Sequence, residues 1–273
     1  MTSRIFHANM FRLKRNKLFW WSLALTALVT AAATAFDCLS IEGDLSLCAL
    51  ETRALAGAPY AQLAAAAVIV LFIGADNSGT IRNKLYVGSP RSGVYAANLL
   101  TGVVIGCSIN AAWLVGGLSG APILGFWRMS FAEAAWLIAV SFAATAAVSV
   151  LSAIVGMLIP RRSAAAVAAM GGAIALMIAA GTVYSRLEQP RETMTAEPAD
   201  GELVFEVKEN PLYIDGLKRA VYEAALHINP LAPAVTLSNC DLTNTAADVA
   251  GTAFVAVFAG SLGAAAFSRR DIK

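Results

Sequence analysis

The sequence contains few charged residues and few side chains suited to catalysis. Only 14% of its 273 residues are charged and 58% are hydrophobic, whereas about a quarter of the residues of an average soluble domain are charged. There are two histidines and four cysteines. A His-Glu-x-x-His zinc motif, a Cys-x-x-Cys pair and a Gly-x-Ser-x-Gly elbow are all missing. We therefore expect neither a soluble domain nor an enzyme.

A functional phosphate-binding loop is also missing. Gly74 to Thr80 has a superficially similar glycine spacing, but Thr80 stands where the loop requires a lysine. Without that lysine, nothing reaches the β- and γ-phosphates of ATP. We expect no catalytic residue, no metal site, no bound cofactor and no nucleic-acid partner for this chain.

Long apolar runs dominate the sequence instead. A helix needs roughly 20 apolar residues to cross a hydrocarbon core of about 30 Å, and these runs do not alternate in polarity as barrel strands would. We predict an all-α integral membrane protein with one transmembrane domain over residues 1–273. Its six spans are expected at about 18–36, 59–75, 94–118, 131–159, 164–184 and 247–267, with a larger extracellular loop at 185–246.

The first run has some features of a signal peptide. Lys14, Arg15 and Lys17 precede it, and it ends in the small residues Ala33-Thr34-Ala35. A signal core usually has about 7 to 15 apolar residues, and residues 18–36 exceed that length. We therefore favour an uncleaved first span.

Basic residues fix the predicted orientation, because cytoplasmic flanks of spanning helices are rich in lysine and arginine. With six spans, both termini share one side with 13 of the 20 basic residues and only two of the 18 acidic residues, a net charge of +11. The remaining seven basic and 16 acidic residues give −9 elsewhere. Both termini are therefore expected in the cytoplasm of a multi-pass plasma membrane protein.

The loop at 185–246 begins with a polar, acidic stretch and becomes amphipathic over Tyr213 to Ile228. A helix there should end before Asn229-Pro230, because proline disfavours a helical residue ahead of it. The helix either returns to the outer membrane surface or belongs to a small solvated cap. We expect no buried acid-base pair in the spans, and His227 is interpreted as a surface residue.

The remaining polar and small residues of the spans indicate helix packing. Asn98 and Asn110 are expected to form hydrogen bonds between helices, and Gly102-x-x-x-Gly106 should allow close helix approach. Outside the spans, Cys38 and Cys48 bracket a short outer loop, where a disulfide is chemically permitted. We predict that they form one.

The segment between the second and third spans carries a family resemblance. DNSGTIRNKLYVGSPRSGVY, Asp76 to Tyr95, resembles the cytoplasmic loop of ABC-2 type transporter permeases, in which an acidic residue precedes a Gly-Thr-Ile-Arg-Asn-Lys-Leu run. His227-Ile-Asn-Pro-Leu231 and the basic ending from Phe267 resemble two further stretches of that family. The arm with Ile5-Phe6, Met10-Phe11 and Leu13 among basic residues resembles its amphipathic N-terminal interfacial helix.

The resemblance implies the permease subunit of an ABC exporter. A second permease copy or a paralogue would complete the channel, and two ATP-binding subunits on the cytoplasmic face would hold ATP and magnesium. The loop would form a short coupling helix, Thr80 to Val87, seated in the ATPase. Thr80 would cap this helix, while Arg82 and Lys84 would face acidic groups of the partner or lipid headgroups. The coupling residues are then Gly79, Thr80, Ile81, Arg82, Asn83, Lys84, Leu85, Gly88 and Arg91.

Two departures from the family concern fine contacts. Asn98 stands where many members have a basic residue, and Asp76 lies nearer the membrane than the family's acidic residue often does. A secondary transporter without an ATPase and a structural or sensory membrane protein remain as alternatives. The substrate stays open, although the acidic outer loop hints at a cationic peptide.

Overall fold

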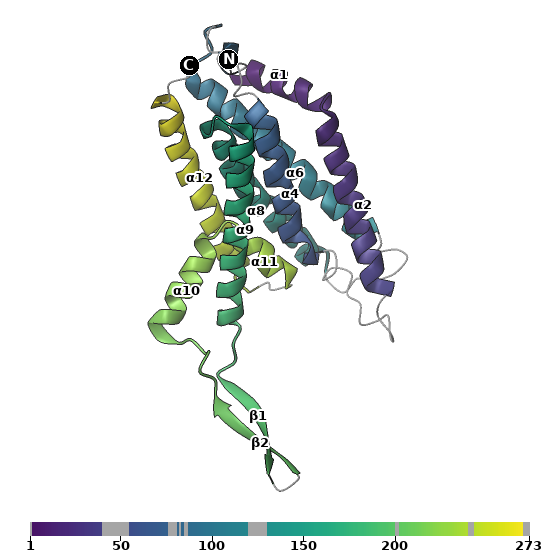
Figure 1. Ribbon diagram of the computed structural model, residues 1–273, viewed down its shortest axis with the longest axis vertical. Helices are drawn as coiled ribbons and strands as arrows, with labels where there is room; N and C mark the ends of the chain where they lie inside the picture. Colours follow the sequence, from purple (N-terminus) through teal and green to yellow (C-terminus); the bar gives the residue numbers. More distant parts are fainter. Residues whose placement is uncertain are drawn as a thin grey trace.

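The computed structural model is a bundle of long helices with a β-hairpin at one end (Figure 1). It describes residues 2–39, 55–75, 81, 83–84, 87–119, 130–199, 202–239 and 243–269. In chain order, the elements are α1 (Thr2–Lys14), α2 (Lys17–Leu39), α4 (Ala58–Gly74), α6 (Arg91–Ser119), α8 (Phe131–Leu158), α9 (Arg162–Leu187), β1 (Glu192–Ala199), β2 (Glu202–Glu209), α10 (Gly216–Ile228), α11 (Ala232–Ser238) and α12 (Thr245–Arg269).

The long helices confirm that this is a helical membrane protein. Five described helices are long and apolar enough to cross a bilayer, namely α2, α6, α8, α9 and α12. The sixth predicted run is the apolar helix α4, which has 17 residues. At 1.5 Å per residue it is about 25 Å long, somewhat shorter than the hydrocarbon core of about 30 Å.

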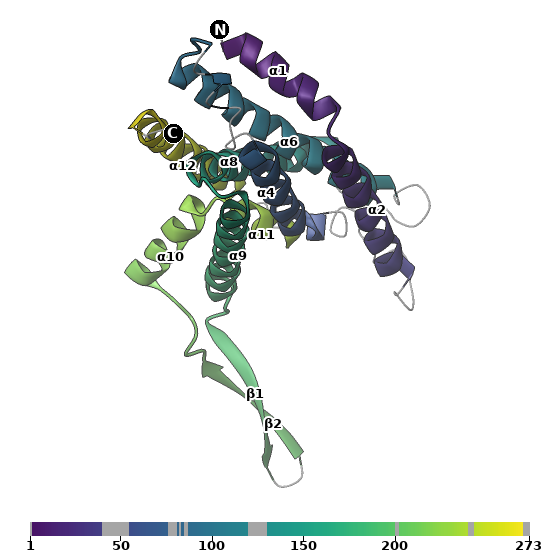
Figure 2. The ribbon, with the colours of Figure 1, turned by 45° about the horizontal axis from the view of Figure 1, so that its top comes forward.

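Helix α4 lies at the centre of the bundle, and α2 and α12 lie at its periphery (Figure 2). Ala65, Ile69 and Val70 of α4 are fully buried. In contrast, only 11% of the most apolar window of α2 or of α12 is buried, against 50% for α6 and α8. Since the exposed surface of α2 and α12 is largely apolar, lipid is its natural solvent.

Glycines permit the predicted close contacts of α6 with its neighbours. A Cβ atom at Gly102 would lie 3.0 Å from the Cβ of Ala153 in α8, and one at Gly106 would overlap Ser149 of the same helix. Gly116 similarly lets the backbone of α2 approach at Ala27. These contacts confirm the packing role predicted for Gly102 and Gly106.

Both chain termini lie at the same end of the bundle, which we call the termini end (Figure 1). Helix α1 runs across this end and confirms the predicted N-terminal helix. Its buried residues Ile5, Asn9 and Leu13 recur every four positions, so they form one face of the helix. That face packs on α6.

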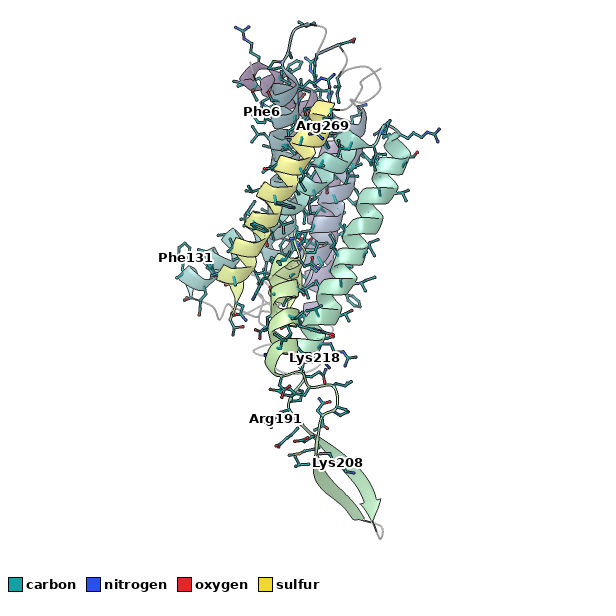
Figure 3. The ribbon with its side chains drawn as sticks, turned by 90° about the vertical axis from the view of Figure 1, so that its left-hand side faces the viewer. Phe6, Phe131, Arg191, Lys208, Lys218 and Arg269 are labelled. Atoms are coloured by element: carbon teal, nitrogen blue, oxygen red, sulfur yellow. The ribbon has the colours of Figure 1, made fainter. Side chains whose placement is uncertain are left out.

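The segment between α9 and α12 differs from a simple polar loop. It begins with an antiparallel β-hairpin that was not predicted. The hairpin projects from the end of the bundle opposite the termini, which we call the hairpin end (Figure 3). Helix α10 then ends at Ile228, directly before Asn229-Pro230 as predicted. The chain next turns back into the bundle as α11, of which all residues from Ala232 to Leu237 are buried. The structure does not decide between the two alternatives for α10, a helix on the outer membrane surface or part of a solvated cap, and α11 was not predicted.

Candidate functional site

The termini end contains a buried network of polar side chains from three separate parts of the chain. The Asn9 side chain of α1 donates from Nδ2 to Asn98 Oδ1 at 2.9 Å and to Thr101 Oγ1 at 3.1 Å, both on α6. Lys84, in the loop between α4 and α6, donates from Nζ to Asn9 Oδ1 at 3.0 Å. We call Asn9, Lys84, Asn98 and Thr101 the polar junction.

The spacing of these residues along their helices explains why they meet. Asn9 lies between Ile5 and Leu13 on the buried face of α1, and Asn98 and Thr101 are three residues apart on one face of α6. Asn9, Asn98 and Thr101 are almost completely buried. Hydrogen bonds between buried polar groups matter because a group left unpaired there costs about 1 to 3 kcal/mol.

The loop that supplies Lys84 is anchored on one side and exposed on the other. Ile81 is 2% exposed and belongs to the same apolar cluster as Ile5 of α1 and Phe72 of α4, whereas Val87 is 82% exposed. Gly88, four residues after the helical Lys84, has a left-handed φ of 84°. The Ser89 amide bonds to the Lys84 carbonyl at 3.2 Å. That bond is typical of a Schellman cap, in which glycine avoids the strain of the left-handed conformation.

The C-terminal side of the loop is joined to α12. Arg91 Nη1 donates to the carbonyl oxygen of Ser268 at 2.7 Å, and the Tyr95 hydroxyl donates to the carbonyl oxygen of Gly260 at 2.7 Å. The Tyr95 ring also lies against Phe267. A displacement of the loop would therefore act on α1, α6 and α12 together.

The structure describes five of the nine predicted coupling residues. Ile81, Lys84, Gly88 and Arg91 make the contacts given above, Asn83 is exposed and accepts a backbone bond from Val87, and Lys84 is directed toward Asn9. Gly79, Thr80, Arg82 and Leu85 lie outside the described residues. Cys48 also lies outside the described residues, and only the backbone of Cys38 is described. The disulfide between these two cysteines therefore stays a prediction.

A second polar cluster, which was not predicted from the sequence, lies toward the hairpin end. Asp248, in the first turn of α12, is 1% exposed. Its Oδ1 lies 2.7 Å from Nδ1 of His227, at the end of α10, and its Oδ2 accepts a bond from Thr236 of α11 at 3.3 Å. The expectation that the spans take part in no buried acid-base pair missed the contact of buried Asp248 with His227, whose side chain is 24% exposed. Asp248, an acid inside an apolar run, was the available signal.

The backbone around this cluster is closely packed. A Cβ atom at Gly251 would overlap the carbonyl of His227, so this glycine lets the end of α10 cross α12. Asn229 donates to the carbonyl oxygen of Leu176 in α9 at 2.8 Å and caps the turn by accepting from the Leu231 amide at 3.0 Å. The cluster thus connects α10, α11 and α12, and the adjoining Asn-Pro turn adds α9.

The other predicted polar contact between spans is confirmed. Asn110 of α6 donates from Nδ2 to the Ser141 hydroxyl of α8 at 3.0 Å. A cavity of about 430 Å³ lies between α2, α4 and α6 and is lined mainly by apolar atoms. In the part of the chain that the structure describes, no group of three or more His, Cys, Asp or Glu side chains is placed to hold a metal ion.

Comparisons with known proteins add no further assignment. No protein-family model, no curated protein and no solved structure matches this chain.

Proposed function

We propose that this chain is the transmembrane permease subunit of an ABC-2 type exporter, driven by ATP hydrolysis in separate ATP-binding subunits. The observation that supports this most directly is the construction of the loop between α4 and α6. Ile81 anchors it in the core, Lys84 and Arg91 connect it to α1 and α12, and Val87 remains exposed. A segment of this kind can transmit a push from a soluble subunit to several helices.

In this proposal α4 also spans the membrane, which gives six spans with the termini end in the cytoplasm. The distribution of basic residues supports that orientation, since arginine and lysine gather at the termini end and on the loop. A second permease copy or a paralogue would form the translocation path together with this chain. ATP and magnesium would bind to the partner ATPase and to no group of this chain.

The exposed Val87 gives a sharp test of the ATPase contact. In Val87→Asp, a charge replaces an apolar side chain at an exposed position of the loop, so the ATPase should be lost when the tagged chain is purified from its own host membranes in a mild detergent. Val207→Asp makes the same change at another exposed valine, on the hairpin, and should leave the ATPase bound. If no ATPase accompanies the wild-type chain, or if Val87→Asp retains it fully, the proposal fails.

A proton-coupled secondary transporter is the second candidate, and the contact of the buried Asp248 with His227 favours it. Ionisable groups inside membrane proteins commonly take part in proton movement, and α10 with α11 forms an interrupted helix pair such as transporters use near their sites. This candidate predicts that the chain alone dissipates a pH gradient in proteoliposomes, measured with an entrapped pH dye. Asp248→Asn should abolish that activity, and the chain should purify without an ATPase.

A further inference from the structure

The β-hairpin presents a face that the rest of the described chain does not cover. The hairpin projects clear of the helices in every view (Figures 1, 2 and 3). Met194 of β1 and Val207 of β2 are 77% and 57% exposed. These two residues are directly opposed across the ribbon, so they lie side by side on the same face.

The register extends this face along the whole ribbon. Successive residues of a strand alternate between its two faces, and directly opposed residues share a face. Three successive pairs on the Met194 side consist of apolar residues in the sequence, and we call these positions the apolar face: Met194↔Val207, Ala196↔Phe205 and Pro198↔Leu203. The other side is mainly polar: Thr193↔Lys208, Thr195↔Glu206, Glu197↔Val204 and Ala199↔Glu202.

Two acidic residues end the apolar face next to the bundle. Glu192 and Glu209 are directly opposed, on the same side of the ribbon as Met194 and Val207. Like charges in that position destabilise a strand pair. Neither glutamate forms an ion pair with a residue that the structure describes. A cationic group supplied from outside would turn this repulsion into attraction.

The two edges of the ribbon are not equivalent. A two-stranded hairpin is only marginally stable in water, and a third strand adds both hydrogen bonds and apolar contact. Pro198 in β1 has no N–H group, which makes that strand a poor template for a further strand. Residues Glu202 to Glu209 of β2 include no proline. The free edge of β2 is therefore the one suited to receive an extended peptide.

Charge selects among the possible occupants of this edge. Residues 192–209 include six acidic residues and one basic residue, a net charge of −5. A second copy of the hairpin would bring an equal negative charge, and an anionic lipid surface would also be repelled. A cationic peptide has the complementary charge. Its apolar residues would extend the apolar face, and its basic residues would lie on the other face, next to the positions of Glu202 and Glu206 in β2.

We propose that the free edge of β2 binds an extended cationic peptide segment in which apolar and basic residues alternate. The surface lies at the opposite end of the molecule from Val87, so the proposal goes beyond the transport function and does not depend on the coupling loop. The probe is a labelled peptide of alternating lysine and valine with the length of β2. Its binding to the full chain in nanodiscs of neutral lipid is measured by fluorescence anisotropy.

Alternation and charge should both be required for binding. A peptide of the same composition with its lysines and valines in two blocks, and an alternating glutamate and valine peptide, should each bind at least tenfold more weakly. N-methylation of the probe backbone should also abolish binding, because it removes the strand hydrogen bonds. If the block peptide binds as well as the alternating one, attraction is only electrostatic and the proposal is wrong.

Matched variants locate the site on the chain. Val207→Asp should weaken binding about tenfold even though it adds a negative charge, and Val87→Asp should leave binding unchanged. Glu192→Lys with Glu209→Lys should weaken binding of the lysine peptide and strengthen binding of the glutamate peptide, which also shows that the variant hairpin is folded. Equal binding by all these variants overturns the proposal. A disulfide that forms between two copies of a Met194→Cys variant even in excess probe also overturns the proposal. It would show that a second copy of the chain occupies the face.

Discussion

Each end of the bundle contains a polar cluster, and the two clusters consist of different kinds of side chain. At the termini end, two asparagines and a threonine join α1 to α6, and Lys84 is the charged member of the polar junction. Toward the hairpin end, the carboxylate of Asp248 and the imidazole of His227 join α12 to α10. Each cluster joins a 13-residue helix to one of the helices that are long and apolar enough to cross a bilayer.

Because their side chains differ, the two clusters should also differ in how much stability a substitution removes. Loss of one hydrogen bond between neutral groups leaves a modest desolvation cost, whereas an unpaired buried carboxylate costs considerably more. The cluster toward the hairpin end should therefore tolerate substitution least. This cluster holds α11 inside the bundle, so loss of the cluster should also loosen the packing of α11.

The largest effect is expected for His227→Ala. Removing the partner of a buried carboxylate can cost about 3 to 5 kcal/mol, and Asp248 would keep only its bond from Thr236. The free energy of unfolding, measured by titration with a denaturing detergent in mixed micelles, should fall by that order. His7→Ala is the control, since His7 is exposed and bonds only within α1, to Ser3.

A double variant separates the unpaired charge from the loss of packing. His227→Ala combined with Asp248→Leu removes both partners, so stability should recover much of the loss seen in the single variant. If His227→Ala is no more destabilising than His7→Ala, the pair has no structural role and the proposed contrast between the two ends is wrong.

The sequence predicted the helices well because the membrane leaves few options. An apolar run that crosses a bilayer must satisfy its own backbone, so the six runs found in the sequence are helices within a few residues of the expected bounds. The end of α10 at Ile228 follows from Asn229-Pro230 for a similarly local reason.

The features that were not predicted either have a weaker sequence pattern or join residues that are far apart in the chain. Leu203, Phe205 and Val207 alternate with other residues, as strands do, but they lie within an acidic stretch that was interpreted only by its charge. Lys84 and Asn9 are 75 residues apart, and no local pattern brings them together. Asp248 was visible in its apolar run, but its partner His227 lies 21 residues away.

An intermediate effect is expected for Asn9→Ala at the polar junction. The change removes three hydrogen bonds and leaves the buried side chains of Asn98 and Thr101 without their partner on α1. We expect a loss of about 2 kcal/mol in the free energy of unfolding. Asn83→Ala is the matched control: Asn83 lies next to Lys84 but is exposed, so its change should stay within about 0.5 kcal/mol. Similar values for the two variants would show that the junction adds no stability.

The smallest effect is expected where α6 meets α12 through Tyr95. A Cβ atom at Gly263 would lie 2.5 Å from the Tyr95 hydroxyl oxygen and 3.1 Å from two carbons of Ile154, whereas one at Gly260 would meet nothing closer than 4.0 Å. Gly263→Ala should therefore destabilise the chain by about 1.5 kcal/mol through overpacking, and Gly260→Ala should not.

Tyr95→Phe tests the cause of that effect, because it removes the hydroxyl that a new methyl group would meet. Alone, it should cost about 1 kcal/mol for the lost bond to the Gly260 carbonyl. In a chain that already carries Gly263→Ala, it should cost less, since it also relieves the clash. Such non-additivity is expected for residues in direct contact. Additive losses in the double-mutant cycle would contradict the contact and remove the proposed connection between the loop and α12 at this point.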